Sequence, residues 1–271
     1  MYDFHYGNKK KILSNTEDFL IFCKRLLPRW VNGIPDSEFL AIYKSLKFIK
    51  SSKPIIVETG CGASTLAFFM YCYLNNGKLF SWDTNGSKGS FLKNVILESI
   101  CYPLKINITD IWTFIPFNST DLNIGIPVLK ELKYKPDYGF FDSWHTLDHL
   151  INEINLFINI SKKKFIIGLD DAYYKKKYQN LSYVNILREK IGLKNIKEEK
   201  NNKCNFFYLE ISNYLKNRGY KLEIKDDYYQ KNYKNDIFFK YFSSDRVIMN
   251  RLGMEEKTKL KNRFKILKIE K

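Results

Sequence analysis

Between residues 53 and 169, short apolar runs alternate with segments of helical periodicity, and this alternation constrains the fold more than any other feature. A strand, a helix and the next parallel strand form a right-handed crossover, so repeated alternation predicts an α/β protein with helices on both faces of a mostly parallel sheet. Ligands of such sheets bind at the carboxyl ends of the strands. The expected strands are 54–57, 78–82, 111–117, 138–141 and 165–169, and the expected helices are 65–74, 90–100, 127–132 and 146–158.

The segments that flank this core have weaker patterns. Residues 1–52 contain helical periodicity at 17–27 and 37–49, with Asp36 as a candidate cap, and are expected to form an N-terminal helical layer. Residues 53–271 are expected to form the α/β domain, with the least regular pattern over 194–271. No internal repeat or Pro/Gly/Ser-rich linker separates the two parts, so we expect one structural unit. The late elements expected are helices at 181–191, 205–218 and 236–251 and strands at 220–224 and 263–269.

The formal net charge is +16, from 45 Lys and Arg residues against 29 Asp and Glu residues. A field of this sign concentrates polyanions such as nucleic acids near a protein surface. The chain is also crowded with Lys, Asn, Ile, Tyr and Phe, the residue types that A/T-rich codons encode, so composition is the preferred account of the charge. The charge therefore leaves a nucleic-acid partner open without favouring it.

Cysteine usage and the lengths of the apolar runs indicate the compartment. The five cysteines include no C-x-x-C pair, so neither a disulfide framework nor a zinc knuckle is predicted. The longest apolar run, 66–74, is about half as long as a membrane-spanning helix. The N-terminus lacks the charged-then-apolar order of a signal peptide. We expect a cytoplasmic protein with no membrane partner.

A glycine-containing turn follows the first expected strand and opens the first helix. Glycine lets the backbone pass close to a ligand, and the amides and hydroxyls at a helix start donate hydrogen bonds to carboxylates or phosphates. A dinucleotide fingerprint needs a third glycine where Thr65 stands, and a pyrophosphate would approach the Glu58 charge, so a dinucleotide is the weaker choice. The candidate cofactor-binding residues of this turn are Glu58, Gly60, Cys61, Gly62, Ser64 and Thr65. Asp83 ends the second strand, where nucleotide-binding folds place a carboxylate that accepts hydrogen bonds from ribose hydroxyls.

Carboxylates also end the fourth and fifth expected strands, at Asp142 and at the pair Asp170 and Asp171. Like charges on one sheet edge repel unless a cation or hydrogen-bond donors neutralise them, and carboxylate oxygens suit a hard cation such as Mg²⁺. His145 titrates near neutral pH and so suits removal of a hydroxyl proton. Its alternative role is to cap the helix that begins near residue 146. These residues predict a metal site and a general base.

The pattern E-x-G-x-G at residues 58–62 resembles motif I of the class I S-adenosylmethionine-dependent methyltransferases. The resemblance implies a Rossmann-like, seven-stranded sheet in which the glycine turn receives the amino-acid half of S-adenosyl-L-methionine. It also implies that Asp83 receives the ribose, that Ser119 lies in the region that faces adenine, and that Asp142 borders the cofactor.

The stretch D-S-W-H-T at residues 142–146 is similar to the D-G-x-H-S stretch of bacterial small-molecule O-methyltransferases, a group that includes macrocin-type sugar methyltransferases and cephalosporin hydroxylase-like proteins. Members that carry a metal hold it at positions matching Asp142, Asp170 and Asp171. Ser143 departs from the usual glycine of this stretch, and the Asp170 and Asp171 pair departs from the Asp-Asn of catechol-type enzymes.

These features predict an S-adenosylmethionine-dependent methyltransferase that methylates the hydroxyl of a small molecule or sugar, with His145 as general base and Mg²⁺ as a candidate cofactor. The first alternative is methylation of RNA or another nucleic acid, but the N-P-P-[FY] tetrad of many exocyclic-amine methyltransferases is absent after the fourth strand. The second alternative is a non-catalytic nucleotide-binding module, because a fold can persist without its chemistry.

Overall fold

The computed structural model describes residues 9–34, 36–170, 172, 185–186, 188–195, 206–225 and 264–271. Asp171 and the expected helix at 236–251 lie outside these residues, as does part of the expected helix at 181–191.

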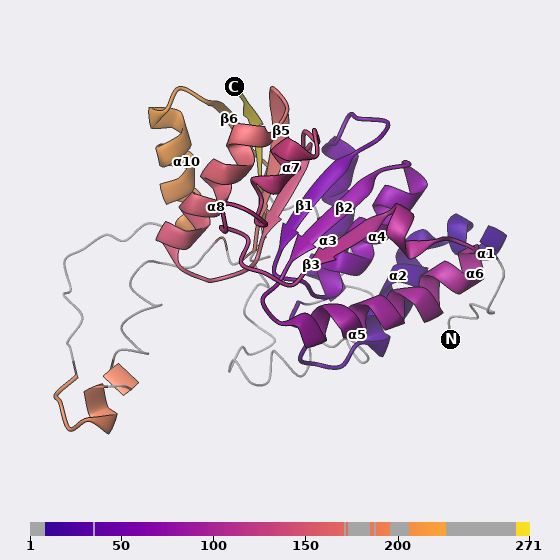
Figure 1. The fold of residues 1–271 in the computed structure, drawn as a ribbon, viewed down its shortest axis with the longest axis horizontal. Coiled ribbons are helices and arrows are strands. Elements are labelled where there is room, and N and C mark those ends of the chain that lie inside the picture. The colour runs from indigo at the N-terminus through magenta and orange to yellow at the C-terminus, as the bar shows by residue number, and fades with distance from the viewer. Residues whose placement is uncertain are drawn as a thin grey trace.

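The described part of the chain forms a seven-stranded sheet in the order β3-β2-β1-β4-β5-β7-β6 (Figure 1). Strands β1 to β5 are parallel to their neighbours, whereas β7 runs antiparallel to both β5 and β6. The prediction of a mostly parallel, seven-stranded sheet is therefore confirmed. The strands are β1 (Ile55–Thr59), β2 (Lys78–Trp82), β3 (Trp112–Ile115), β4 (Tyr138–Phe141), β5 (Lys164–Leu169), β6 (Lys221–Lys225) and β7 (Lys265–Glu270).

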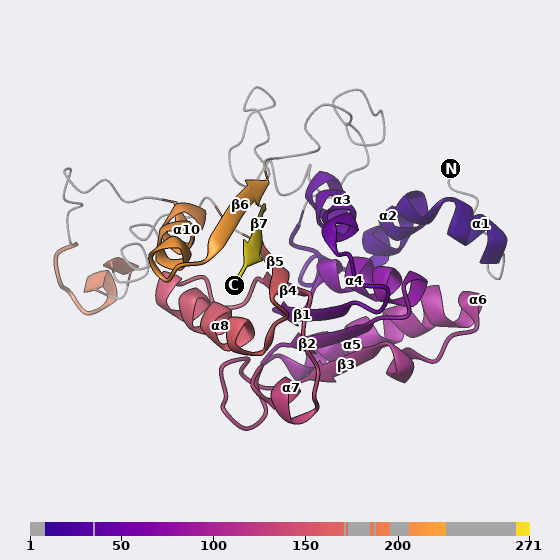
Figure 2. The same ribbon diagram turned by 90° about the horizontal axis from the view of Figure 1, so that it is seen from above.

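Helices cover both faces of the sheet, as Figure 2 shows for α3 and α4 on one side and α7 and α8 on the other. The first face carries α1 (Lys9–Ser14), α2 (Thr16–Leu26), α3 (Asp36–Ser45), η1 (Leu46–Phe48), α4 (Ala63–Leu74), α5 (Gly86–Ile96), η2 (Leu97–Cys101), α6 (Tyr102–Leu104) and η3 (Ile108–Asp110). The second face carries α7 (Val128–Glu131), α8 (Leu147–Ile160) and α10 (Phe207–Asn217).

Two element boundaries differ from the sequence expectation for identifiable reasons. The helix expected from residue 90 begins at Gly86, because the Asn85 side chain caps it by accepting a hydrogen bond from the Lys88 amide. The third strand ends at Ile115 and not at residue 117, and Pro116 follows it without a backbone N–H to continue the ladder.

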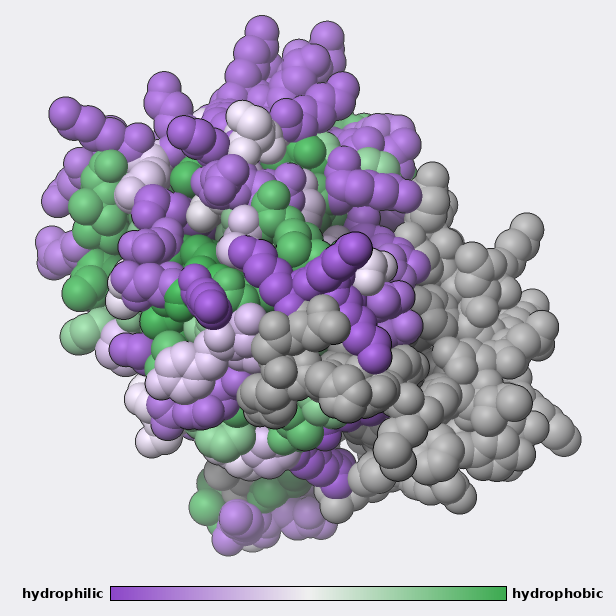
Figure 3. All heavy atoms as spheres, turned by 90° about the vertical axis from the view of Figure 1, so that its right-hand side faces the viewer, coloured by the Kyte–Doolittle hydropathy of each residue, from purple (hydrophilic) through white to green (hydrophobic). Residues whose placement is uncertain are grey.

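The N-terminal helices share one apolar core with the sheet. Ile12 of α1, Leu20 of α2 and Phe39 of α3 belong to the same buried cluster as Phe68 of α4 and Ile56 of β1. Figure 3 shows the end of the molecule that carries these helices, where apolar side chains are interspersed among hydrophilic ones. Among the described residues, no helix is long and apolar enough to cross a membrane.

A buried ion pair joins α2 to the start of α3. The Lys24 ammonium is fully buried and donates to Asp36 Oδ1 at 2.8 Å, and it lies 5.9 Å from the centre of the Phe39 ring. The Arg25 guanidinium donates to Asp36 Oδ2 through Nε at 2.9 Å and through Nη2 at 2.7 Å. Asp36 is therefore the common acceptor for two cations within the N-terminal layer.

We expect the two partners of this pair to respond unequally to substitution. Asp36→Ala removes the carboxylate from a buried ammonium and should lower the free energy of unfolding by about 3 kcal/mol. Lys24→Met keeps the apolar volume and leaves Asp36 bound to Arg25, so it should cost less than about 1 kcal/mol. Urea denaturation followed by circular dichroism measures both. Equal losses for the two variants would contradict the assigned asymmetry.

Candidate functional site

Gly60 makes the turn between β1 and α4 possible. Its φ angle is +82°, and a Cβ atom at this position would lie 1.8 Å from the backbone oxygen of Asp142. The Gly60 amide donates to the Trp82 carbonyl at 2.8 Å, and the Asp142 amide donates to the Thr59 carbonyl at 2.9 Å. The ends of β1, β2 and β4 therefore converge on a backbone position that only glycine can fill.

Gly62 places the same turn against the N-terminal layer. Its amide donates to Thr65 Oγ1 at 3.1 Å, which closes the first turn of α4. The Val31 carbonyl lies 3.3 Å from the position of a Cβ on Gly62, so the segment between α2 and α3 passes over the glycine turn. In that segment Trp30 is 54% exposed, and its ring lies 5.3 Å from that of Phe91 on α5. The Trp30 ring thus lies against α5, in a segment whose backbone passes over the turn.

Glu58 lies beneath the turn and is fully buried. Its carboxylate accepts hydrogen bonds from the hydroxyls of Ser64 at 2.6 Å, Thr65 at 2.9 Å and Ser81 at 2.7 Å. Burial raises the pKa of Glu58 from 4.5 to about 7, although the three hydroxyl hydrogen bonds and Lys88 act in the opposite direction. The Ser64 and Thr65 hydroxyls donate hydrogen bonds to Glu58. The backbone of the turn is therefore the part that faces a ligand, and the Glu58 carboxylate holds that backbone in place.

Asp83 follows β2 and contacts the turn directly. Its Oδ2 accepts from the Cys61 amide at 3.0 Å and from Lys88 Nζ at 3.1 Å, and its Oδ1 accepts from the Asn85 amide at 2.8 Å. A carboxylate has about four lone-pair sites, so these three donors leave capacity for a ribose hydroxyl. The Cys61 side chain is buried, and burial raises the pKa of its thiol, so this residue contributes its backbone amide.

The second predicted cluster lies at the same edge of the sheet. Phe141 and Leu169, the last residues of β4 and β5, are paired in register, so Asp142 and Asp170 follow neighbouring strand ends. Both are partly buried, and His145 is exposed in the loop between β4 and α8. The structure does not describe Asp171, and among the described residues no group of three or more His, Cys, Asp or Glu side chains is arranged to hold a metal. The three-carboxylate metal site therefore stays a prediction.

Glu153 of α8 is a site residue that the sequence analysis missed. It is fully buried and accepts hydrogen bonds from the hydroxyls of Ser119 and Ser143, the latter at 2.7 Å. His149 Nε2 lies 3.4 Å from the same carboxylate oxygen. The expected adenine-side residue Ser119 is therefore held against α8 by its hydroxyl. The sequence does contain a pattern that could have indicated Glu153. It is a carboxylate at helical spacing within the apolar helix face formed by Leu150, Ile154 and Phe157.

Comparisons with known proteins identify the fold. No family model matches the sequence, and no curated protein matches it. Among solved structures, an O-methyltransferase from Bacillus cereus in complex with S-adenosylhomocysteine superposes with a TM-score of 0.52 at 12% identity, over 95% of this chain and 91% of that one. A Staphylococcus aureus protein assigned as a caffeoyl-CoA O-methyltransferase gives 0.51 at 10% identity, over 97% and 99%. The chain has the fold of these O-methyltransferases.

Replacing Gly60 by alanine tests the geometry of the turn. Gly60→Ala forces a side chain into the Asp142 carbonyl and a left-handed backbone, so we expect a loss of about 3 kcal/mol or more in the free energy of unfolding. The matched control is Gly86→Ala in the first turn of α5, where a Cβ meets only Pro116 at 3.7 Å. Thermal unfolding compares the two variants. A Gly60→Ala protein as stable as the control would show that the turn is not constrained in this way.

The raised pKa of Glu58 predicts a pH dependence of stability. Between about pH 4.5 and 7 the unfolded chain releases the proton that the folded protein retains, so the stability contribution of this group is complete below pH 4.5 and is lost as the pH rises to 7. Over this window the free energy of unfolding of the wild type should fall relative to Glu58→Gln by an amount on the order of 3 kcal/mol. Urea denaturation at several pH values measures the difference, with the exposed Glu131→Gln as a control for the loss of one carboxylate. Parallel pH profiles for wild type and Glu58→Gln would contradict the buried, proton-retaining carboxylate.

Proposed function

We propose that this protein is an S-adenosylmethionine-dependent methyltransferase that methylates a hydroxyl group of a small molecule. The observation that carries the proposal is the turn at Gly60 and Gly62, held against the Asp83 carboxylate at the carboxyl edge of a methyltransferase-type sheet. The two compared structures support this reading, because both are described as O-methyltransferases and one is bound to S-adenosylhomocysteine.

The residues present fit the proposed cofactor. Gly60 creates a position that a Cβ would fill, so the backbone can meet the amino-acid half of the cofactor at close range. Asp83, already oriented by the Cys61 amide, would accept hydrogen bonds from the ribose hydroxyls. When bound, S-adenosylmethionine supplies an electrophilic methyl group. Glu58 and its three hydroxyl donors would keep this surface in place.

His145 would act as the general base in this arrangement. The acceptor hydroxyl gives up its proton as its oxygen forms the new bond to carbon, and an imidazole exposed in the loop after Asp142 can take that proton. Holding the acceptor oxygen in line with the methyl group is chiefly a positioning task. Trp30 and the segment over Gly62 would form part of the acceptor-binding surface, because the backbone of that segment passes over the turn.

A divalent cation such as Mg²⁺ would fit beside this base. Asp142 and Asp170 follow paired strand ends and would supply oxygen ligands, with Asp171 as the third carboxylate in the sequence. The cation would lower the pKa of an acceptor hydroxyl that it contacts. We also place the protein in the cytoplasm, since the four described cysteines are buried as thiols.

Binding of S-adenosylhomocysteine tests the proposed cofactor. We expect a one-to-one complex with micromolar affinity by calorimetry and a higher melting temperature. Asp83→Ala should weaken binding by about tenfold or more, because the ribose loses a charged acceptor. Asp110→Ala, which removes an exposed aspartate beyond β2, is the matched control. Absence of binding to the wild type at millimolar ligand would refute the proposal, and equal affinity of the Asp83→Ala variant would reject the role of Asp83.

A methyl-transfer assay distinguishes the proposed base, His145, from the neighbouring His149. His145→Ala should lower the rate by roughly 100-fold or more with little change in cofactor affinity. His149→Ala, whose imidazole faces Glu153, should retain most of the rate. Chelation should lower turnover and leave cofactor binding intact if the carboxylates hold a cation. The assay needs an acceptor, which mass spectrometry of ligands that co-purify with the protein can identify. Full activity of His145→Ala would assign proton removal to solvent or to another residue.

A further inference from the structure

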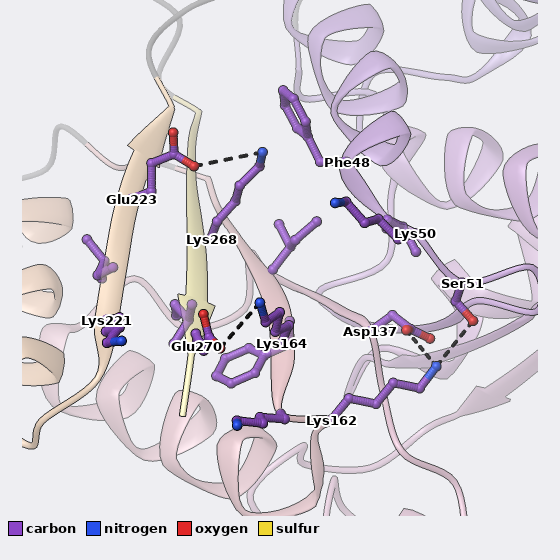
Figure 4. A pocket seen from close by; sticks show the side chains of 16 residues that line it. Phe48, Lys50, Ser51, Asp137, Lys162, Lys164, Lys221, Glu223, Lys268 and Glu270 are labelled. Carbon is purple, nitrogen blue, oxygen red and sulfur yellow. Dashed lines mark hydrogen bonds and ion pairs between the residues drawn. The ribbon is translucent and has the colours of Figure 1, made fainter.

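A lysine-lined groove of about 770 Å³ lies at the edge of the sheet opposite the glycine turn (Figure 4). Its walls come from the segment between η1 and β1, the starts of β5 and β6, and the end of β7. The groove lining reaches Ile166 of β5, so roughly 10 Å of strand, at about 3.3 Å per residue, separates the groove from the end of β5 at the proposed cofactor site. The groove is therefore a separate cavity, within the 300–1,000 Å³ range of small-molecule sites.

The groove has an excess of positive charge. Three carboxylates lie among its lysines, and each is already paired: Asp137 with Lys162 at 2.7 Å, Glu270 with Lys164 at 3.3 Å, and Glu223 with Lys268 at 3.9 Å. Within the part of the chain that the structure describes, the three other lining lysines have no carboxylate partner. These are Lys50, Lys163 and Lys221. The groove thus carries three cations that its own side chains leave unneutralised.

The floor of the groove is apolar, and lysine side chains extend over it. Ile49 and Ile166 line the groove and are buried, and Lys268 Nζ lies 4.0 Å from the centre of the Phe48 ring. In Figure 4 the Lys50 and Lys268 side chains extend toward one another from opposite walls. Burial is the main cause that lowers the pKa of Lys268; repulsion by the like charges of Lys225 and Lys50 acts in the same direction, and Glu223 acts in the opposite one. An anion placed between them would relieve this repulsion.

We propose that this groove binds a phosphorylated small molecule, with its phosphate oxygens on Lys50 and Lys221 and its apolar part on the floor beside Phe48. Phosphate oxygens accept charge-assisted hydrogen bonds from ammonium groups, and several lysines around one anion suit a di- or triphosphate. The three interspersed carboxylates and the bounded volume favour a compact anion over a continuous nucleic-acid backbone, which would pass close to Glu223 and Glu270.

Inorganic pyrophosphate is the probe that tests this groove without an adenine or ribose. Its affinity is measured by calorimetry at constant ionic strength, alone and with saturating S-adenosylhomocysteine. The test variant is Lys50→Gln/Lys221→Gln. The control variant removes the same charge from exposed lysines on α5 and α7: Lys93→Gln/Lys130→Gln. Thermal unfolding verifies that both variants fold like the wild type.

We expect pyrophosphate to bind whether or not S-adenosylhomocysteine is present. Affinity should fall by about tenfold or more in the groove variant, because charge-assisted contacts are lost, and by less than about threefold in the control. Equal weakening in both variants would overturn the proposal in favour of net charge alone. Competition with S-adenosylhomocysteine would place the anion in the cofactor site instead. Tighter binding of a single-stranded RNA than of pyrophosphate, lost in the same groove variant, would assign the surface to nucleic acid.

Discussion

The site depends on one buried carboxylate. The Glu58 carboxylate is fully buried. Hydroxyls from the start of α4 and from β2 donate hydrogen bonds to it. An unpaired carboxylate in this place would be costly, so Ser64, Thr65 and Ser81 are needed where they lie. The three hydrogen bonds fix the direction in which α4 leaves β1. The backbone of the glycine turn is thereby presented to the carboxyl edge of the sheet, and Asp83 contacts it through the Cys61 amide.

Most of the fold could be predicted from the sequence because its elements are locally specified. The alternation of apolar strands with helical segments predicted the five parallel strands to within about two residues, in a sheet covered on both faces, and weaker patterns after it placed β6 and β7 equally closely. Local sequence patterns could not predict which side chains of different helices and strands contact one another. Asp36 could be recognised as a residue at the start of a helix, but its ion pair with the buried Lys24 depends on how α2 packs on α3.

The candidate site was predictable to the same degree. The residue types and order identified the turn, Asp83 and the carboxylates after β4 and β5, because each follows a strand end. The roles within the turn required the structure: Ser64 and Thr65 face Glu58, and Ser119 faces Glu153 on α8. Glu153 itself lies on an apolar helix face, and no local sequence pattern relates it to Ser119 and Ser143.

The two edges of the sheet also differ in charge, with carboxylates at one edge and unpaired lysines at the other. The net charge of the whole chain does not reveal that separation.

The central claim is that the turn at Gly60 and Gly62 receives S-adenosylmethionine beside the loop that carries Asp142 and His145. The most direct measurement is a crystal structure of the protein with S-adenosylhomocysteine. The account predicts the homocysteine part against the backbone of residues 60–62, the ribose hydroxyls on Asp83, and the sulfur toward the loop after β4. Ligand bound elsewhere on the protein, or no ligand at the turn at saturating concentration, would contradict it.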